Sequence, residues 1–393
     1  MFPKLRFKEF DDDWSPYVLK DFVSFRKGKG ISKADISENG INECIRYGEL
    51  YTTYGQVIDH IHSKTNVSKS ECILSKAGDV IIPASGETQI DIATASCVLH
   101  DDIILSGDLN ILSHEENGSW LAYYLSSAKK LEIAQLAQGN SVVHLYSSQL
   151  KDLKINKPSK EEQTKIASFL SNVDEKISQL TKKHELLSQY KQGMMQKLFS
   201  QQIRFRADDG SEFGEWASEK ISKVFTNKSK SFNPLLNESL PCIELEHLSQ
   251  NTGQILGTVN SSDQQSTKNL FEPNSVLYGK LRPYLRKFAK PQFKGVCSSE
   301  IWVLTGLKIS NDYLFQFVQS EQFTELTNIQ SGSKMPRADW NVIADAEIEF
   351  PCLGEQTKIA NFLSSIDQKI EVVAQQIEQA KQWKKGLLQQ MFI

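Results

Sequence analysis

Two stretches of the chain carry apolar residues at alternating steps of four and three positions, which is the spacing of a heptad repeat. Each seam runs for about five heptads, long enough to predict a long helix that enters a coiled coil. At about 1.5 Å per residue, each helix would be about 50–60 Å long. The predicted coiled-coil residues are Ile166, Leu170, Val173, Ile177, Leu180 and Leu187 in the first stretch and Ile359, Leu363, Ile366, Ile370, Val373 and Ile377 in the second.

Polar residues interrupt both seams at His184, Lys191 and Lys384. In one interpretation, the lysine stems pass along the apolar surface and bring their amines to water at a fraying end of the helix. In the other, the lysines set the register of the helix pair, as buried polar seam residues can. The pattern alone leaves both interpretations open.

The second seam repeats the first. Residues 162–177 (EQTKIASFLSNVDEKI) and 355–370 (EQTKIANFLSSIDQKI) are identical at twelve of sixteen positions, at an offset of 193 residues. The beginnings of the two halves also correspond, since the Leu-Arg-Phe motif at 5–7 is matched by Ile-Arg-Phe at 203–205. The chain therefore consists of two similar halves, each with a globular part followed by a long helix.

The connectivity predicts how the two helices pair. An antiparallel pair brings the end of the first helix to the start of the second, where the second globular part can join them, whereas a parallel pair would require that part to span a whole helix. We therefore expect an antiparallel coiled coil with a pseudo-twofold axis. The expected segments are a globular domain at 1–157, a spacer helix at 158–201, a second globular domain at 202–350 and a second spacer helix at 351–393.

Outside the seams, short apolar or alternating runs broken by turn residues predict strands, for example at 78–83, 108–112, 275–278 and 300–304. Longer runs at 123–137 and 313–326 predict one helix each. The expected fold class is α+β: two similar β-rich domains separated by two long helices that form an antiparallel coiled coil.

Composition and motifs narrow the function. The chain has 393 residues, of which 39% are hydrophobic and 24% charged, as in folded domains. It has no apolar run long enough to span a membrane, no secretory leader, and six scattered cysteines, so we expect a cytoplasmic location. Phosphate-loop, dinucleotide, zinc-hydrolase, serine-hydrolase and amino-methyltransferase motifs are absent from the sequence, so we expect a binding protein with no catalytic residue and no metal site.

The main candidate site is a basic stretch at 280–294, which holds six cations and three aromatic residues after a predicted strand. Lysines there can contact phosphates, and an arginine can form a bidentate contact with a guanine edge. A solvated basic hairpin is the alternative, and the net charge of −3 for the chain does not favour DNA binding. The candidate DNA-binding residues are Lys280, Arg282, Tyr284, Arg286 and Lys287.

The first half has a corresponding loop that is polar but not basic, with Ser85, Glu87, Thr88 and Gln89, which suits reading bases more than holding phosphate. A second paired element is a Gly-Ser turn followed by a cation or an imidazole, for which a structural turn is as good an interpretation as a DNA-facing loop. Its candidates are Asn140 and His144 in the first half and Ser333, Lys334 and Arg337 in the second, and Arg26, Lys27 and Lys29 are candidate backbone contacts.

Several segments together resemble a known family. They are PKLRFKEFDDDW at 3–14, VLYGKLRPYLRK at 276–287, GVCSSEIWVL at 295–304, and the pattern P-x3-EQTKIA-x-FLS at 158–171 and 351–364. The combination is similar to the specificity subunit of type I restriction–modification systems, and the resemblance covers essentially the whole chain.

The resemblance implies two target-recognition domains, each reading one half of a bipartite sequence in double-stranded DNA, with the coiled coil setting the spacing. It also implies two methyltransferase subunits docked on the helices and restriction (motor) subunits joined through the complex. The chain itself would be non-catalytic and carry no cofactor. S-adenosylmethionine, ATP and Mg would lie on partner subunits, which would carry N6-adenine methyltransferase and ATP-dependent endonuclease activity. The alternative is a non-DNA coiled-coil scaffold that presents two protein-binding modules.

Overall fold

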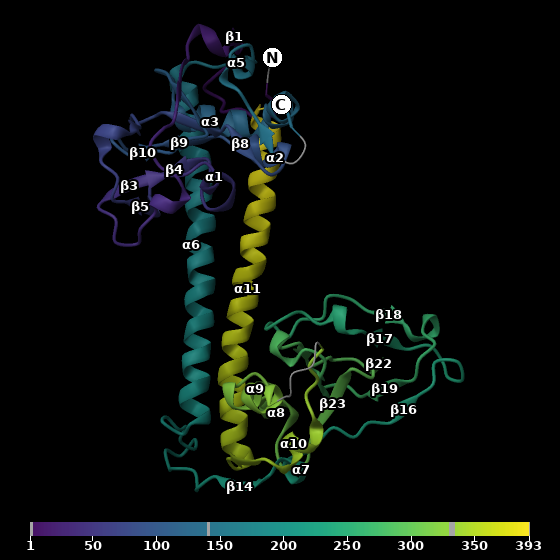
Figure 1. Ribbon diagram of the computed structural model, residues 1–393. Helices are drawn as coiled ribbons and strands as arrows, with labels where there is room; N and C mark the ends of the chain where they lie inside the picture. Colours follow the sequence, from purple (N-terminus) through teal and green to yellow (C-terminus); the bar gives the residue numbers. More distant parts are fainter. Residues whose placement is uncertain (1–2, 140–141, 330–334, 393) are drawn as a thin grey trace. The chain divides into compact units, whose positions relative to one another are not determined.

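The computed structural model describes residues 3–139, 142–329 and 335–392 and divides into two compact units. Unit 1 comprises Met1–Thr181 and Gln375–Ile393, and unit 2 comprises Lys182–Ala374. Two long helices, α6 (Lys160–Phe199) and α11 (Leu353–Phe392), each contribute one part to each unit (Figure 1).

The globular part of unit 1 is built mainly from short strands. They are β1 (Ser15–Val18), β2 (Ser24–Lys27), β3 (Asn42–Ile45), β4 (Val57–Ile58), β5 (Ser63–Thr65), β6 (Ile73–Leu74), β7 (Val80–Pro83), β8 (Ser85–Gly86), β9 (Ser96–Val98), β10 (Ile104–Leu105), β11 (Leu109–Ser113), β12 (Val143–His144) and β13 (Lys154–Lys157). The helices of this part are α1 (Glu49–Thr52), α2 (Gln89–Ile92), α3 (Gly118–Ser127), α4 (Lys130–Leu136) and α5 (Ser147–Leu150). In the described residues, one sheet has the order β2-β11-β7-β9-β4 and another β5-β3-β10-β6, while β1 pairs with β13 and β8 with β12.

The globular part of unit 2 has the same style of construction. Its strands are β14 (Ala217–Lys220), β15 (Phe225–Thr226), β16 (Ser231–Phe232), β17 (Pro241–Ile243), β18 (Val259–Asn260), β19 (Lys268–Phe271), β20 (Val276–Gly279), β21 (Phe288–Ala289), β22 (Gly295–Cys297), β23 (Ile301–Gly306) and β24 (Glu347–Phe350). Its helices are α7 (Ile221–Val224), α8 (Asn311–Phe317), α9 (Glu321–Asn328) and α10 (Trp340–Asp345), and η6 (Pro283–Leu285) is a 3₁₀ turn. Among the described strands, the sheet orders are β15-β23-β20-β21 and β16-β19-β22-β17-β18, and β14 pairs with β24.

All four of the predicted strands named above are present, as β7, β11, β20 and β23. In each unit the first of these strands pairs antiparallel with the second, with Ile81 opposite Ile111 and Leu277 opposite Val303. These side chains are buried, as the continuous apolar runs predict. The four central strands therefore follow directly from the sequence pattern, whereas their pairing is seen only in the fold.

The prediction of a single helix at 123–137 and at 313–326 is wrong in both cases, because each region holds two helices. The first run is divided between α3 and α4, and Lys129 between them has a backbone ψ near 0°. The second is divided between α8 and α9, where the Ser320 hydroxyl accepts a hydrogen bond from the Phe323 amide at 3.2 Å and so caps α9. A serine that competes for backbone amides favours such a helix start over helix continuation.

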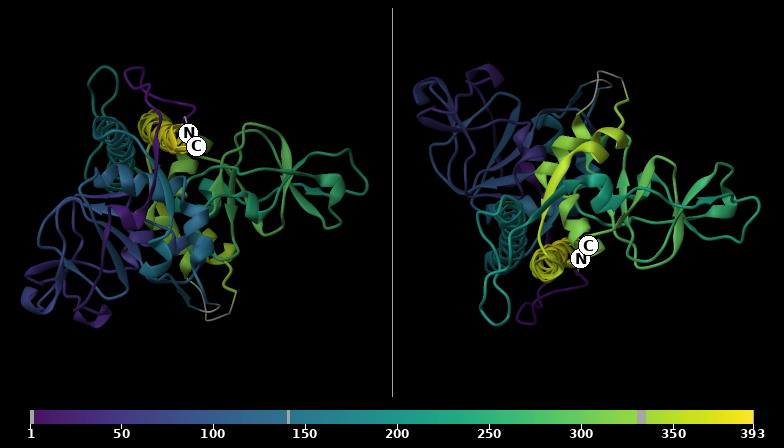
Figure 2. Two further views of the ribbon diagram at one scale, coloured as in Figure 1. Left: turned by 90° about the horizontal axis from the view of Figure 1, so that it is seen from above. Right: turned by 90° about the horizontal axis from the view of Figure 1, so that it is seen from below.

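The core of unit 1 includes the start of α6 and the end of α11. Ile166 and Leu170 lie in one buried cluster with Leu387 and Met391. The start of the chain joins the same core, since Trp14 contacts Phe392, and the Leu5 amide donates to the Gln390 carbonyl at 2.9 Å. Figure 2 accordingly places the N-terminal segment beside the end of α11.

The core of unit 2 includes the opposite ends of the same helices. Met195 and Leu198 of α6 share a buried cluster with Ile359 and Leu363 of α11. In each unit, therefore, the start of one long helix packs beside the end of the other. This confirms the α+β fold with two similar halves and an antiparallel helix pair, while the exact segment boundaries proposed from the sequence stay predictions.

The seam lysines are ion-paired between the helices. Lys191 Nζ lies 2.5 Å from Asp367 Oδ1, and Lys384 Nζ lies 2.6 Å from Asp174 Oδ1. Both carboxylates belong to the repeated segment, so the two pairs are related by the internal repeat. This geometry favours the register interpretation over fraying, because each lysine has a defined partner on the other helix.

The first turn of each long helix is held by an arginine from the segment that begins its half. Arg6 donates to both carboxylate oxygens of Glu162 at 2.7 Å, and Arg204 donates to Glu355 at 3.1 and 2.7 Å. Ser159 caps α6, since its hydroxyl accepts from the Glu162 amide at 3.3 Å. The Glu162 side chain bonds to Arg6, so the start of α6 combines a serine cap with a buried ion pair.

Candidate nucleic-acid interface

In unit 1, the structure joins two predicted loops into one surface. Strand β8 pairs antiparallel with β12, which places Ser85 opposite His144. The Ser85 hydroxyl lies 3.2 Å from His144 Nδ1, and the His144 ring stacks on Tyr146 with centroids 6.3 Å apart. We call the segments 83–89 and 138–146 the first loop pair.

The polar end of the first loop pair is open to solvent. Glu87 and Gln89 are exposed, and Thr88 caps the short helix α2 by accepting from the Asp91 amide at 3.1 Å. The Thr88 hydroxyl also donates to the Asp91 carboxylate at 2.6 Å. Thr88 therefore holds the loop in shape, whereas Glu87 and Gln89 expose polar side chains to solvent.

Main-chain hydrogen bonds join the residues on either side of the Gly-Ser turn of the first half. Gln138 and His144 exchange main-chain hydrogen bonds at 2.9 and 2.7 Å. Gly139 has a backbone φ of 125°, and a Cβ there would lie 2.1 Å from the Val142 carbonyl oxygen, so only glycine fits.

Three predicted site residues, Asn140, Ser333 and Lys334, lie outside the described residues.

Unit 2 brings the corresponding segments together. The Arg282 amide donates to the Pro336 carbonyl at 2.8 Å, and the Ala338 amide donates to the Lys280 carbonyl at 2.9 Å. Arg337 forms an ion pair with Glu300 at 3.1 Å. We call the segments 280–290 and 335–338 the second loop pair.

The tip of the second loop pair has unusual backbone geometry. The turn η6 is flanked by Arg282 with φ of 52° and Arg286 with φ of 47°, both left-handed. This conformation costs non-glycine residues about 1–2 kcal/mol each, and it persists where the surroundings hold it. Between the two arginines, Tyr284 is 55% exposed, so the turn presents one aromatic ring and the Arg282 side chain to solvent.

Most cations of the basic stretch are already engaged within the protein. Arg286 donates to the Gln319 carbonyl, Lys287 donates to the Leu245 carbonyl at 2.6 Å, Lys290 pairs with Asp312, and Lys294 pairs with Glu272 at 3.1 Å. Among the residues that the structure describes, the side chains of Lys280 and Arg282 have no ion-pair partner. The geometry thus gives Arg286 and Lys287 anchoring roles and leaves Lys280, Arg282 and Tyr284 as the side chains available to a ligand.

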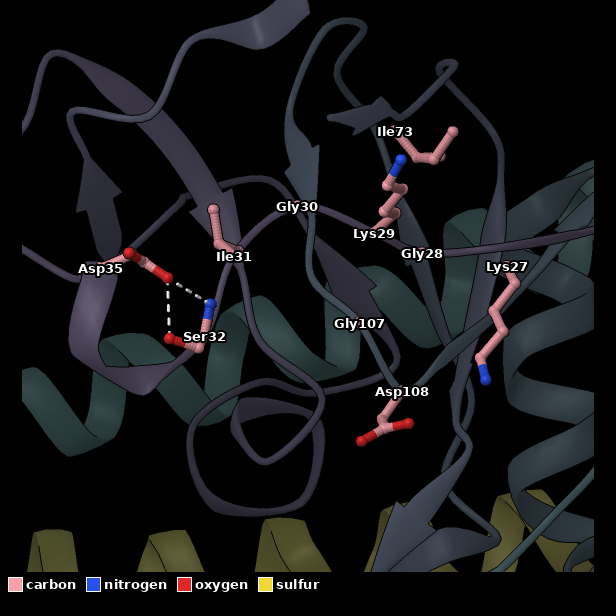
Figure 3. A pocket seen from close by; sticks show the side chains of 10 residues that line it. All are labelled: Lys27, Gly28, Lys29, Gly30, Ile31, Ser32, Asp35, Ile73, Gly107 and Asp108. Atoms are coloured by element: carbon pink, nitrogen blue, oxygen red, sulfur yellow. Dashed lines mark hydrogen bonds between the residues drawn. The ribbon is translucent and has the colours of Figure 1, made fainter. Parts of the chain in front are cut away.

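The three basic candidates in and after β2 also divide into one residue engaged within the protein and two that are exposed. Arg26 donates to the buried Asp79 carboxylate and to the Leu74 carbonyl, so its guanidinium stabilises the core of unit 1. Lys27 and Lys29 are exposed and line an open depression of about 740 Å³, where their amines point away from each other (Figure 3). They are the cations that this surface offers to phosphate.

The same depression contains acidic groups. Asp108 lies on its wall, and the Asp35 carboxylate accepts hydrogen bonds from the Ser32 amide at 2.8 Å and hydroxyl at 2.7 Å (Figure 3). These hydrogen bonds lower the pKa of Asp35 below its ordinary value, so it is ionised at neutral pH. The depression therefore has mixed charge and is not a strong anion site by itself.

Tyr146 is not among the site residues predicted from the sequence, although it is exposed and its ring stacks on that of the predicted His144. The signal available was an aromatic residue two positions after the histidine, on the same face of an extended segment. The repeat of Arg6 as Arg204 is visible in the sequence, but it does not indicate a role. The fold provides one, because it places these arginines beside Glu162 and Glu355.

In the part of the chain that the structure describes, His, Cys, Asp and Glu side chains do not gather in groups of three or more that could hold a metal ion. Searched over those same residues, no helix combines the length and apolarity that a membrane span needs.

Comparison with known proteins decides the family. The model of the type I restriction modification DNA specificity domain matches residues 11–188 and again 215–382. The chain belongs to this family. Its two matched regions correspond to the two similar halves, so each half is one DNA specificity domain.

Curated specificity subunits are similar over long stretches. The type I restriction enzyme MjaVIII specificity subunit of Methanocaldococcus jannaschii is 24% identical over 402 residues, covering 96% of this chain and 91% of the relative. The EcoDI specificity subunit of Escherichia coli is 24% identical over 293 residues, covering 66% of this chain and 65% of the relative.

Solved structures share the fold. The S subunit of a type I restriction–modification system from M. genitalium has a TM-score of 0.64 at 16% identity, covering 100% of this chain and 99% of that chain. A chain from a structural study of complex assembly in the type I system has a TM-score of 0.55 at 14% identity, covering 97% and 98%.

Proposed function

We propose that this specificity-family protein reads a bipartite sequence in double-stranded DNA, one half-site with each loop pair. The observation that carries the proposal is that one specificity-domain model matches the chain twice, while the two matched domains present unlike side chains at corresponding loops. A duplicated reader with two identical surfaces would read two identical half-sites. Two different surfaces fit two different half-sites.

The chemistry of each loop pair supports this assignment. In the first, Glu87 can accept a hydrogen bond from a cytosine amino group, and Gln89 can form a bidentate contact with adenine. In the second, Arg282 can form a bidentate contact with guanine, and Tyr284 can pack on an exposed sugar or base. Lys27, Lys29 and Lys280 are suited to backbone phosphates.

We further propose that α6 and α11 set the gap between the half-sites and dock two methyltransferase subunits, and that restriction subunits join through that complex in the cytoplasm. The chain has no catalytic role in this account, and S-adenosylmethionine, ATP and Mg act on the partners. More acidic than basic residues occur in the chain, with 48 against 45, so the attraction for DNA would come partly from the assembled complex.

The test is methylation mapping. The gene is expressed together with genes for methyltransferase and restriction subunits of its source in a host that lacks adenine methylation of its own, and methylated adenines are mapped across the genome. We expect one two-part motif with a gap of fixed length, which disappears when this gene alone is deleted.

The scaffold alternative predicts a different result. If the chain presented protein-binding modules and did not read DNA, deletion would leave the methylated motif unchanged. A motif without a gap would contradict reading by two separate loop pairs.

A further inference from the structure

Unit 2 contains a line of polar contacts that begins at a buried lysine on the helix pair and continues through half-buried side chains. Lys191 of α6 is only 8% exposed, and its amine lies 2.5 Å from Asp367 Oδ1 of α11 and 2.6 Å from Gln319 Oε1. Asp367 also accepts a hydrogen bond from Gln316 at 3.2 Å. The lysine therefore joins both long helices to the junction between α8 and α9.

The same line continues to the second loop pair. The main-chain carbonyl of Gln319 accepts a hydrogen bond from Arg286 Nη2, and Arg286 Nη1 lies 3.9 Å from Glu321. Arg286 is the left-handed residue that ends the turn η6, and its own amide donates to the Pro283 carbonyl at 2.8 Å. One residue, Gln319, thus contacts the helix pair with its side chain and the turn with its main chain.

Unit 1 has the corresponding ion pair between the long helices, but that pair is not linked to the first loop pair. The repeat-related Lys384 pairs with Asp174 at 2.6 Å and donates to Gln56 Oε1 at 2.9 Å. At the offset of 193, the residue that corresponds to Gln319 is Ser126, whose hydroxyl is bonded instead to the main chain of Ala95. Gln56 precedes β4 and is not part of the first loop pair.

The shape of the turn η6 depends on this connection, because its backbone is strained. Left-handed backbone at Arg282 and Arg286 is held by contacts from outside the turn, because neither residue prefers it. Removing the buried lysine leaves the Gln319 amide oxygen without its charged donor, and the junction between α8 and α9 can then relax. That junction carries the carbonyl that holds Arg286.

From this geometry we propose that Lys191 is a positioning residue for DNA recognition, acting through Gln319 and Arg286 on the tip that presents Arg282 and Tyr284. Lys384 has no such role. The inference rests on the proposed function, since it concerns the accuracy with which the second loop pair reads its half-site.

The experiment compares K191M with the matched variant K384M in the full chain, co-expressed with the same methyltransferase and restriction subunits as in the test of the proposed function. Methylated motifs are mapped, and R282A identifies which half-site belongs to the second loop pair. We expect K191M to raise methylation at sites with a mismatch in that half-site by about tenfold, within the usual range for remote coupling. K384M should leave the bases of both half-sites unchanged.

A second variant separates positioning from folding. Q319L keeps the ion pair between Lys191 and Asp367 and removes the hydrogen bonds of the Gln319 side chain to Lys191 and to the Phe315 carbonyl. The thermal midpoint should therefore fall less than in K191M, while the same half-site becomes relaxed. If Q319L and K191M both retain wild-type specificity, or if K384M relaxes the same half-site equally, the proposal is wrong. If wild type itself yields no two-part motif, the proposed function fails instead.

Discussion

The two halves of this molecule share a buried framework and differ at their loops. At corresponding positions, Gln163 accepts from the Asn117 amide and Gln356 accepts from the Ser310 amide, both at the start of a helix that covers the central strands. The ion pairs of the seam lysines repeat in the same way. The loop pairs show no such agreement.

The contacts that the two halves share are buried or half-buried, and the residues in which they differ are exposed. Buried polar groups need partners, so a change at one of them leaves another uncompensated and is costly. An exposed loop residue such as Glu87 or Arg282 has no such constraint. Two copies of one domain can therefore acquire different binding surfaces while the helix contacts below them stay the same.

The largest expected effect comes from breaking the repeated arginine–glutamate pairs. Removing one partner of a buried pair costs about 3–5 kcal/mol, because the other charge stays buried. Arg6 is 12% exposed and Arg204 is 28% exposed, so E162L should lower the free energy of unfolding more than E355L.

Urea unfolding of the two variants measures this difference. E9Q is the control, because Glu9 forms an exposed ion pair with Lys165 and its loss should not change stability measurably. Equal stability of wild type and E162L would show that the buried pair does not hold the start of α6.

The next effect concerns the unlike loops. R282A should lower base discrimination in one half-site and Q89A in the other. Each loss should be about 1–3 kcal/mol, because a bidentate contact to a base edge is lost. Methylation mapping of both variants measures the change. K294A is the control within the basic stretch, because Lys294 already pairs with Glu272. Relaxation of both half-sites by either variant would contradict separate reading.

The smallest effect is a difference in acid sensitivity. Burial lowers the pKa of His114 below its ordinary value of 6.5, against the opposite influence of Asp79 and Glu116. Below about pH 6.5 the unfolded chain then binds more protons than the folded chain, so stability falls as the pH is lowered. The corresponding residue in unit 2 is Leu307, which cannot titrate.

Thermal unfolding of wild type and H114L between pH 7.5 and 5 tests this, because that range contains the ordinary histidine pKa. H114L should show a weaker decline of stability with falling pH, whatever its stability at neutral pH. Parallel pH profiles would mean that His114 is protonated equally in the folded and unfolded chain.

The sequence was most informative where periodicity is strong. The seams predicted both long helices and the apolar runs predicted the central strands, because burial of one stripe or one strand is a local pattern. The antiparallel pairing followed from the connectivity of the two halves. The helix break before Ser320 could have been predicted as well, since a serine followed by Glu321 is a common helix start.

The candidate site was less predictable. Arg282 and Arg286 are four residues apart in one basic stretch, and nothing in the pattern distinguishes them, yet the first side chain is exposed and the second is bound to Gln319. Likewise, Arg26 looks like a surface cation until its partner Asp79 is placed beside it. Such roles depend on residues distant in sequence, which composition and spacing do not reveal.

The central claim is that two unlike readers are held at a distance that the helix pair sets, and one measurement tests it most directly. One heptad is inserted after Lys182 in α6 together with one after Gln375 in α11, the points that the two seam ion pairs imply to be matched. Each helix then gains about 10 Å, the rise of about three base pairs. Methylation mapping should show the same two half-sites with a longer gap, and altered half-sites or an unchanged gap would contradict the account.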